Sequence, residues 1–597
     1  MNIYEVLDDI IVNDRYGLSS QLFKHNDREL LSEKDKTIFD LLKNISSIGT
    51  KVYNTKIEFH PMLVMSNGKR TYSVDDITDE DYSVLTELEF DRIPIALRVL
   101  IADILWVYKK DYKAATVAAN SYWEFFKILY KPGGNVETLD LIRRAVCISI
   151  QIKSGKVYNE ICEWLNDYLK NEAVTNNGFY TLRLMELFAE QKKFDVSVFL
   201  EALDELINNN DNIAVIEQSY NLKSRCLFKL QKKEEAKSNN LLLAEYYLKY
   251  AESIVESNIQ NTFNAVEYYR KGILFYRNNG ESLKAEEAQK RLVEIQKVIP
   301  QIITPVLHKF DIKDLVDNIR INMDGLTFEE CVLRITQMIS FEKKEELKNL
   351  VIRQYTEHPL AYIFVKKIIN SQGQTVLVLP PLDLKNPEKD LSILELHMHQ
   401  KALEIEKLEG DIWIKYSLEM LRDNFLISAE MLEFLVKDNP IIPEGREKIF
   451  TSGLCLFLKG NYYEAMHILA PQTENLFRNI AKEVGGLTVT LENDGSSMEK
   501  VLSSIFSLPE LLDCYDNDIL FIFEGLLNEQ AGANIRNEIA HGIISEYFCS
   551  SGACLYFGAA IIKLLSYTST KCYQILKSSK KLQKYELPNE KALRIIK

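Results

Sequence analysis

The sequence predicts a mostly α-helical protein, in which an α-solenoid-like (tetratricopeptide-like) helical array is followed by a C-terminal helical bundle, with a few short β-hairpins. Only 14 prolines and 23 glycines occur in 597 residues, so residues that break helices are scarce. Apolar residues recur at three- and four-residue spacing over long segments, which is typical of helices with one buried face. The chain is too long for one ordinary core and predicts about two to four domains.

Residues 1–85 are predicted to be a mixed α/β segment. Within the stretch "KIEFHPMLVMSNGKRTYSVDDI", two β-rich runs flank Ser66, Asn67 and Gly68. Because Asn-Gly favours the tight turn of a hairpin, this stretch predicts two antiparallel strands that meet at this turn.

Residues 86–300 are predicted to form the helical array. The stretch "IPIALRVLIADILWVYKKDYKAATVAANSYWEFFKILYK" has the apolar spacing of two helices, with a break near Lys110 and Asp111. A second helical pair follows in "FNAVEYYRKGILFYRNNGESLKAEEAQKRLVEIQKVI". The pairs do not recur at the fixed spacing of about 34 residues of tetratricopeptide repeats, so the pattern indicates a solenoid-like array rather than a regular repeat.

Residues 301–445 are predicted to be a helical linker domain with a small β-hairpin. Pro300 and Pro305 mark its start. In "SQGQTVLVLPPLDLKNPEKD", Gly373 opens a short strand that Pro380 and Pro381 close. The boundary after this domain is marked by Pro440, Pro443 and Gly445.

Residues 446–597 are predicted to form the helical bundle. Its first helix is "GNYYEAMHILAPQTENLFRNIAKEV", and "GGLTVTLENDGSS" is a polar insertion with some strand character. The other helices are predicted in "MEKVLSSIFSLPELLD", "NDILFIFEGLLNEQ", "NIRNEIAHGIISEYF" and "ACLYFGAAIIKLLSYTSTKCYQILKSSKKLQKY".

Charge and cysteine usage limit the function classes. The formal net charge of −14 repels nucleic acid, so a nucleic-acid site has to be a local basic pocket. The nine cysteines are scattered and form no C-x-x-C pair, which indicates neither a zinc site nor a disulfide framework and suits a reducing compartment. The acidic N-terminus lacks the pattern of a signal peptide, and the longest apolar run is too short to cross a bilayer. We therefore expect a cytoplasmic protein without a membrane segment.

The stretch "GANIRNEIAHG" combines residue types that suit phosphate chemistry. With Asn534 as the N-cap of a helix, Arg536 and Asn537 fall in the first turn and His541 lies one turn further. A helix N-terminus favours a bound anion, Arg536 adds a cation and His541 can carry a proton. RNA cleavage by the adjacent 2′-hydroxyl group needs this set and no metal.

A purely structural interpretation of the same residues remains open. In that interpretation Arg536 and Glu538 are solvated and His541 packs in a groove of the bundle. The spacing of arginine and histidine is unspecific, because Arg353 and His358 have it too. That copy runs into a proline and lacks the asparagine, and we interpret it as accidental.

The motif RNxxxHG, which ends at Gly542, resembles the signature of a domain family of unknown function that is similar to the HEPN superfamily. The upstream stretch "GNYYEAMHILAPQTENLFR" also resembles the opening helix of this family, and the eukaryotic ER-membrane-associated RNA degradation protein resembles it too. The resemblance implies an HEPN-like bundle in residues 446–597 with Arg536, Asn537 and His541 at the catalytic positions. A tyrosine that some HEPN toxins have two residues after the histidine is replaced here by Ile543.

The resemblance implies a metal-independent endoribonuclease in defence or stress response. His541 is expected to act as general acid or base, Arg536 to stabilise the phosphorane, and Asn537 to orient His541 or bind phosphate. RNA is then the expected partner, together with a second copy of the chain bound through the bundle. The alternative is a non-catalytic helical scaffold that binds RNA or protein, with a protein partner on the helical array.

Supporting and weaker candidates complete the predicted site. The supporting residues are Asn534 just before the motif and Glu538 and Gly542 within it. Glu474 on the first bundle helix either faces the motif or is a surface or capping residue. His397 and His399 stand two residues apart without a carboxylate or cysteine cluster, so we predict no metal site. A phosphate-binding loop of the P-loop type is absent, and no cofactor is expected.

Overall fold

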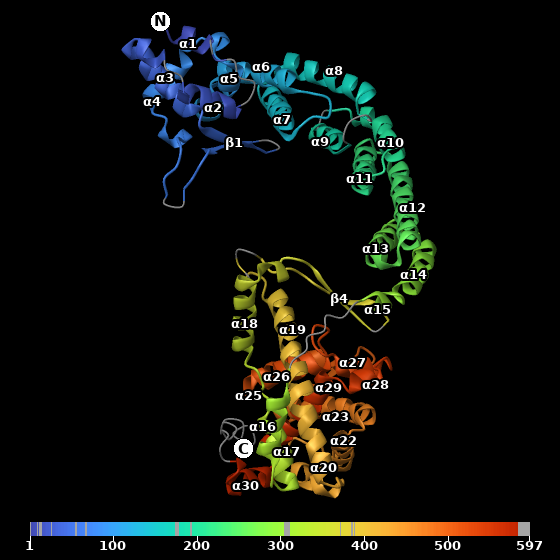
Figure 1. Cartoon of the computed structure of the whole chain (residues 1–597). Helices are drawn as coiled ribbons and strands as arrows, with labels where there is room; N and C mark the ends of the chain where they lie inside the picture. The colour runs from blue at the N-terminus through green and yellow to red at the C-terminus, as the bar shows by residue number, and fades with distance from the viewer. Residues whose placement is uncertain are drawn as a thin grey trace. The chain divides into compact units, whose positions relative to one another are not determined.

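The computed structural model describes residues 2–8, 10, 15–24, 27–53, 56–65, 68–173, 178–191, 194–303, 311–370, 372–383, 386 and 388–582. The described chain is dominated by helices, with three short two-stranded sheets, which confirms the predicted mostly α fold (Figure 1). Contacts divide the chain into two compact units, Met1–Ile295 and Gln296–Lys597. Among the described residues, no helix is both long and apolar enough to cross a membrane.

The first unit begins with short helices and one β-hairpin. Strand β1 (Ile48–Val52) pairs antiparallel with β2 (Ile57–Pro61). The other elements of this segment are α1 (Ile3–Asp8), α2 (Arg15–Lys24), η1 (Asp27–Leu30), α3 (Glu33–Ile45), η2 (Val74–Asp76), α4 (Asp79–Thr86) and η3 (Phe90–Arg92).

The hairpin lies earlier in the chain than the sequence predicts. Ser66 and Asn67 of the predicted turn lie outside the described residues. The residues beside that turn form an isolated antiparallel bridge between Val64 and Arg70, with two further backbone hydrogen bonds across the turn but no regular strands. The regular strands precede it because Ile48 is buried in the core of the first unit, whereas Val64 is 66% exposed.

The helical array occupies the rest of the first unit. Many of its helices pack on the next one along the chain. The elements are α5 (Ile95–Ile104), a π-helical turn η4 (Leu105–Lys109), α6 (Tyr112–Leu129), α7 (Val136–Gln151), α8 (Gly155–Asn171), α9 (Gly178–Ala189), η5 (Val196–Phe199), α10 (Leu200–Asn209), α11 (Ile213–Lys229), α12 (Lys233–Ser257), η6 (Ile259–Asn261), α13 (Thr262–Asn278) and α14 (Ser282–Gln296).

The predicted break near Lys110 and Asp111 is where the structure has one. Lys110 adopts a left-handed conformation, and the Asp111 carboxylate caps α6 by accepting hydrogen bonds from two backbone N–H groups. The array is held by a core that includes one buried ion pair, in which Arg144 donates to Asp103 at 2.6 and 2.8 Å. Tyr122 donates to the same carboxylate at 2.9 Å, so both buried charges have hydrogen-bond partners.

The second unit opens with helices and the β3–β4 hairpin. Strand β3 (Lys366–Ile369) pairs antiparallel with β4 (Thr375–Leu379), which confirms the small hairpin predicted around Gly373. The remaining elements are α15 (Ile299–Ile302), α16 (Lys313–Met323), α17 (Phe328–Gln337), α18 (Lys344–Glu357), η7 (Pro359–Ala361), α19 (Leu391–Glu409), the π-helical turn η8 (Gly410–Ile414), α20 (Lys415–Asn424), η9 (Glu430–Leu432), α21 (Glu433–Val436) and α22 (Glu447–Lys459).

The C-terminal helices follow the long helix α23 (Tyr462–Glu483), which runs through Pro471. The polar insertion forms the hairpin of β5 (Val489–Leu491) and β6 (Ser497–Glu499), so its predicted strand character is confirmed. The later helices are α24 (Leu502–Phe506), α25 (Pro509–Cys514), α26 (Asn517–Leu527), α27 (Ile535–Ala540), α28 (Glu546–Cys549), α29 (Gly552–Thr568) and α30 (Thr570–Ser578).

Two helices predicted as continuous are divided in the structure. The stretch 498–513 becomes the end of β6 followed by α24 and α25, because Pro509 cannot donate a backbone hydrogen bond and starts a new helix instead. The stretch that holds the motif is divided into α27 and α28. The second unit has one continuous core that extends from Ile319 to Leu582. This core includes residues on both sides of position 445/446, so the predicted linker domain and helical bundle share one core.

Candidate functional site

A close contact between two glycines positions the motif loop. The Ala533 N–H group donates to the Gly525 carbonyl on α26 at 2.9 Å, and the Asn534 N–H group donates to the same oxygen at 3.3 Å. A Cβ atom on Gly532 would lie 2.1 Å from that oxygen. The absence of a side chain on Gly532 therefore allows the loop to rest directly on α26.

The helix that carries the motif is shorter than predicted. Helix α27 has six residues, and His541 is its C-terminal cap residue. Gly542 follows with φ +67°, a left-handed conformation that ends the helix and favours glycine. Because α27 is so short, its dipole contributes little to the anion site that was predicted at its N-terminus.

Asn534 occupies the predicted N-cap position without capping the helix. Its backbone is left-handed, with φ 54° and ψ 29°, and its side chain accepts no hydrogen bond from a backbone N–H group of α27. The side chain oxygen instead accepts a hydrogen bond from the Asn537 amide at 2.7 Å. The prediction of an N-cap was wrong in geometry, because the loop's contact with Gly525 sets the backbone conformation at Asn534.

Arg536 forms an ion pair with Glu474 of the first bundle helix. Its Nε atom lies 2.5 Å from Oε2 of Glu474, and its Nη2 atom lies 3.5 Å from Oε1. Arg478 donates to Glu474 Oε1 at 2.6 Å through Nη2. The side chains of Glu474 and Arg478 are 12% and 13% exposed, whereas that of Arg536 is 33% exposed. One carboxylate therefore orients two guanidinium groups, and only that of Arg536 is substantially open to solvent.

Asn537 connects Arg536 to the preceding loop. Its side chain oxygen accepts a hydrogen bond from Arg536 Nη1 at 2.9 Å. Its amide nitrogen donates to Asn534 and to the carbonyl of Asn528 at 3.2 Å. Asn537 therefore holds Arg536 in place, and its side chain makes no hydrogen bond with His541.

His541 and Glu538 lie three residues apart at the end of α27. The His541 side chain is exposed and forms no hydrogen bond with any described residue. Glu538 is half-buried, and desolvation raises the pKa of its carboxyl group, although the nearby His541 opposes this shift. The Glu538 side chain likewise has no hydrogen bond or ion pair within the described part of the chain.

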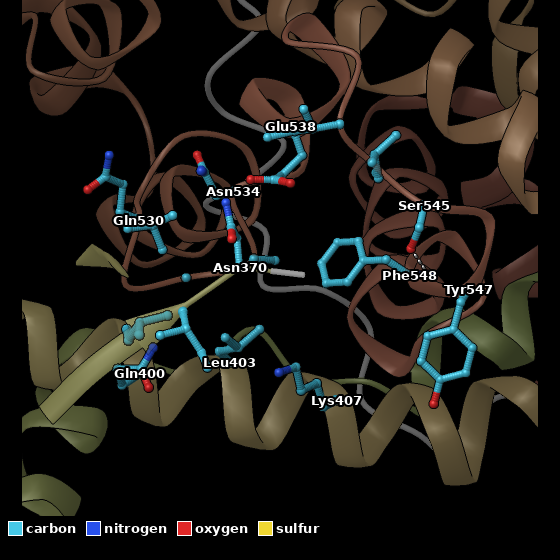
Figure 2. A pocket seen from close by; sticks show the side chains of 17 residues that line it. Asn370, Gln400, Leu403, Lys407, Gln530, Asn534, Glu538, Ser545, Tyr547 and Phe548 are labelled. Atoms are coloured by element: carbon cyan, nitrogen blue, oxygen red, sulfur yellow. Dashed lines mark hydrogen bonds between the residues drawn. The ribbon is translucent and has the colours of Figure 1, made fainter. Parts of the chain in front are cut away.

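A cavity of about 370 Å³ lies beside the motif. Figure 2 shows the Glu538 carboxylate and the Phe548 ring projecting into it, with Leu403 and Lys407 on α19 along one side. The β3–β4 hairpin closes another side through Ile368, Asn370 and neighbouring residues. The remaining wall comes from the motif loop and the segment after it, which contribute Gln530, Gly532, Ala533, Asn534, Ile543, Ile544, Ser545 and Tyr547.

The other sequence candidates are separate from this site. Arg353 is exposed on α18, and His358 is the exposed cap residue at its end, directly before Pro359. His397 is 3% exposed and its Nε2 atom lies 2.9 Å from the Pro380 carbonyl oxygen. His399 stacks on Phe521, and burial lowers its pKa to about 3. Among the described residues, no group of three or more His, Cys, Asp or Glu side chains is placed to hold a metal ion.

Several contributors to the site were not singled out from the sequence. Arg478 lies four residues after Glu474, a spacing that favours an ion pair on a helix and could have been noticed. The Asn528 carbonyl, Lys407 and Phe548 carry no local signal of a role, because their places beside the motif depend on packing between distant segments.

Comparison with known proteins gives one match in the N-terminal part of the chain. Residues 1–160 match a family described as a domain of unknown function (DUF7380). A comparison with curated proteins finds no match, and a comparison with solved structures finds none either. The matched residues do not include the RNxxxHG motif, so the resemblance of the C-terminal bundle to HEPN proteins stays a prediction.

Proposed function

We propose that the second unit is a metal-independent endoribonuclease of HEPN type. The observation that supports this proposal best is the fixed Arg536 guanidinium. It is oriented by Glu474 and Asn537, stays one-third exposed, and lies on the same short helix whose end presents the exposed His541. A pre-oriented cation and an exposed imidazole on one short helix suit charge stabilisation and proton transfer at one phosphate.

In the proposed reaction, the 2′-hydroxyl group of the RNA attacks the adjacent phosphorus and the bond from phosphorus to the 5′-oxygen breaks. The hydroxyl proton leaves to a base, and a second proton reaches the departing 5′-oxygen. His541 serves one of these transfers, and Arg536 stabilises the extra negative charge on the phosphorane. Asn537 acts as a positioning residue for Arg536 through their 2.9 Å hydrogen bond.

A single motif supplies one histidine for two proton transfers. We therefore propose a homodimer in which two C-terminal bundles bring their motifs to one RNA groove, with RNA as the substrate. Pairing also doubles the local positive charge in a chain whose net charge is −14. Light scattering should show a dimer, and a stable monomer with full cleavage activity would contradict the shared groove. We also propose a cytoplasmic location and a role in defence or stress response.

The test is RNA cleavage by the full-length protein in EDTA. We expect cleavage to survive chelation and to leave 2′,3′-cyclic phosphate ends. His541→Ala should abolish it, and His358→Ala, which removes the exposed histidine of the other arginine–histidine copy, should leave the rate within about threefold of wild type. Cleavage that requires added magnesium, or an equal loss of cleavage in the His541→Ala and His358→Ala variants, would contradict the mechanism.

A second candidate function is a non-catalytic scaffold that binds RNA or protein. The ion pair between Arg536 and Glu474 favours this alternative, because Glu474 neutralises part of the positive charge that Arg536 would offer to a phosphate. Under this alternative the wild-type protein binds its partner without cleaving RNA, and His541→Ala leaves that binding unchanged.

A further inference from the structure

The cavity beside the motif contains polar groups that the protein itself leaves unsatisfied. Glu538 has no hydrogen bond or ion pair to a described residue, and the same is true of the exposed Lys407 ammonium group. Asn534 uses its oxygen to accept from Asn537, which leaves its amide nitrogen as a donor. Gln400 donates its amide nitrogen to the Ala531 carbonyl, which leaves its oxygen as an acceptor.

Much of the remaining lining is apolar, and the Phe548 ring supplies an aromatic face. Phe548 projects its ring into the cavity (Figure 2), and the aliphatic side chains of Ile368, Val376, Leu403 and Ile543 line the walls. The volume of about 370 Å³ lies within the range of small-molecule sites. Such sites measure ~300–1,000 Å³ and combine apolar walls with a few convergent polar groups, as this cavity does.

The pattern of donors and acceptors restricts the ligand. A hydrocarbon ligand would bury the Glu538 carboxylate without a partner, which is costly. A simple cation would meet Glu538 but would be repelled by Lys407. A flat ring with N–H donors, ring acceptors and an attached anion satisfies Glu538, Asn534 and Lys407 together. Nucleotides have this combination, and aromatic side chains stack on their bases.

We propose that this cavity binds a nucleobase with an exocyclic amino group, stacked on Phe548 and recognised by Glu538. The amino group donates to the Glu538 carboxylate, a ring acceptor receives the Asn534 amide, and the nucleotide's phosphate lies toward Lys407. Uracil fits poorly, because its single N–H group lies between two carbonyl oxygens that would face the carboxylate.

For an RNA substrate, the bound base belongs to a nucleotide next to the cleaved phosphate. Glu538 is on the same six-residue helix as Arg536 and three residues before His541. The cavity then selects the sequence that is cleaved. This extension to the cleavage site rests on the proposed ribonuclease function, whereas the binding of the base does not.

Isothermal titration with full-length His541→Ala protein tests the proposal without cleavage. The ligands are short single-stranded RNAs of cytidine, adenosine or uridine and, in a separate arm, the free 5′-monophosphates of the same nucleosides. We expect the cytidine and adenosine ligands to bind about tenfold more tightly than uridine. Adding Glu538→Gln should reduce the preference to about threefold or less, because a glutamine side chain both donates and accepts.

A matched control is Glu546→Gln, which changes an exposed acid on α28 that does not line the cavity. The variant with this control substitution should still bind cytidine and adenosine ligands more tightly than uridine. Phe548→Leu should weaken all bases by a similar factor, because it removes stacking and retains apolar volume. A preference for cytidine and adenosine over uridine in the RNA arm alone identifies RNA as the ligand. The same preference in both arms indicates that a free nucleotide is also bound.

The outcomes separate this proposal from the proposed function. Base-selective binding that depends on Glu538, in a wild-type protein that cleaves no RNA, supports the cavity and refutes the ribonuclease. Cleavage by wild type together with binding that ignores base identity refutes the cavity and leaves the ribonuclease. Binding of no ligand in either arm also overturns the base-binding proposal.

Discussion

Glu474 is the residue on which the geometry of the motif depends most. It joins Arg536 and Arg478 at 2.5 and 2.6 Å, and its side chain is only 12% exposed. Without this carboxylate, two guanidinium groups repel each other, and one of them is largely buried. Arg536 also loses the bond that fixes its Nε atom.

Glu474→Gln should therefore lower both stability and the proposed activity. We expect a loss of about 1–2 kcal/mol in the free energy of unfolding, below the value for a fully buried pair because Arg536 is one-third exposed. Thermal denaturation followed by circular dichroism measures this change. Glu464→Gln, at the exposed start of the same helix, should cost much less, because it removes only a weak interaction with the helix N-terminus. A melting temperature for Glu474→Gln equal to that of the control would show that the ion pair contributes no stability.

Glu406 on α19 is a buried acid whose charge is costly. It is 3% exposed, and burial raises the pKa of its carboxyl group from 4.5 to about 8, with Glu409 adding to the shift. The folded chain therefore binds this proton more tightly than the unfolded chain. The contribution of Glu406 to stability is complete below pH 4.5 and is lost as the pH rises through 8.

Glu406→Gln should raise stability at alkaline pH and change it little in acid. We expect a gain of about 2–4 kcal/mol near pH 9 and almost none near pH 4, because the glutamine never ionises. Melting temperatures of wild type and variant across this range test the sign. Glu404→Gln, on the exposed side of the same helix, should show no such pH-dependent difference. A variant less stable than wild type at alkaline pH would contradict the buried-acid interpretation.

At the scale of elements, the contact between the motif loop and α26 places α27. The loop approaches so closely that Gly532 has no room for a side chain beside the Gly525 carbonyl oxygen. Helix α27 then packs against α23, which brings Arg536 to Glu474. The site therefore combines α23 with α27, and the preceding loop of α27 is held on α26 by backbone contact.

Gly532→Ala should displace the motif loop. A Cβ atom would lie 2.1 Å from backbone oxygen, so the loop must move, with an expected loss of about 1–3 kcal/mol and of the proposed cleavage activity. Calorimetric unfolding measures the loss. Gly155→Ala at the start of α8, where no atom lies within 4 Å, is the matched control and should be neutral or slightly stabilising. Unchanged stability in both variants would mean that the loop can move away from α26 without cost.

At the scale of the whole molecule, the chain consists of two units with separate cores. The core of the first unit extends from Ile3 to Cys226, and that of the second unit from Ile319 to Leu582. Each unit has its own helices and its own buried residues. Residues of the motif, Glu474 and the lining of the cavity all belong to the second unit.

Residues 1–295 and 296–597 should therefore fold as separate fragments. We expect each to show a cooperative thermal transition, and the second fragment to retain the proposed cleavage and base binding, because its buried contacts are internal. Circular dichroism of the two fragments tests the folding. A second fragment that unfolds without a transition, next to a first fragment that melts cooperatively, would show that the second unit depends on the first.

The sequence by itself determined the helical class, the break at Lys110 and Asp111, the hairpin around Gly373 and the strand character of residues 485–497. These features follow from interactions within a few residues, namely apolar spacing, capping and turn residues. The sequence also singled out Arg536 and His541 as a chemically suitable pair. It misplaced the first hairpin and extended the motif helix too far, because burial and backbone contacts with other segments decided both.

Only the tertiary structure decided which distant residues meet. Glu474 and Arg536 are 62 positions apart, and the cavity combines the β3–β4 hairpin, α19 and the segment from Gln530 to Phe548. No local pattern encodes such pairings, because they depend on how the helices pack in three dimensions. For the same reason the hydrogen bond between Asn537 and Arg536 was not predicted. The sequence shows which residue types the motif contains, whereas the packing of the bundle determines which residues they contact.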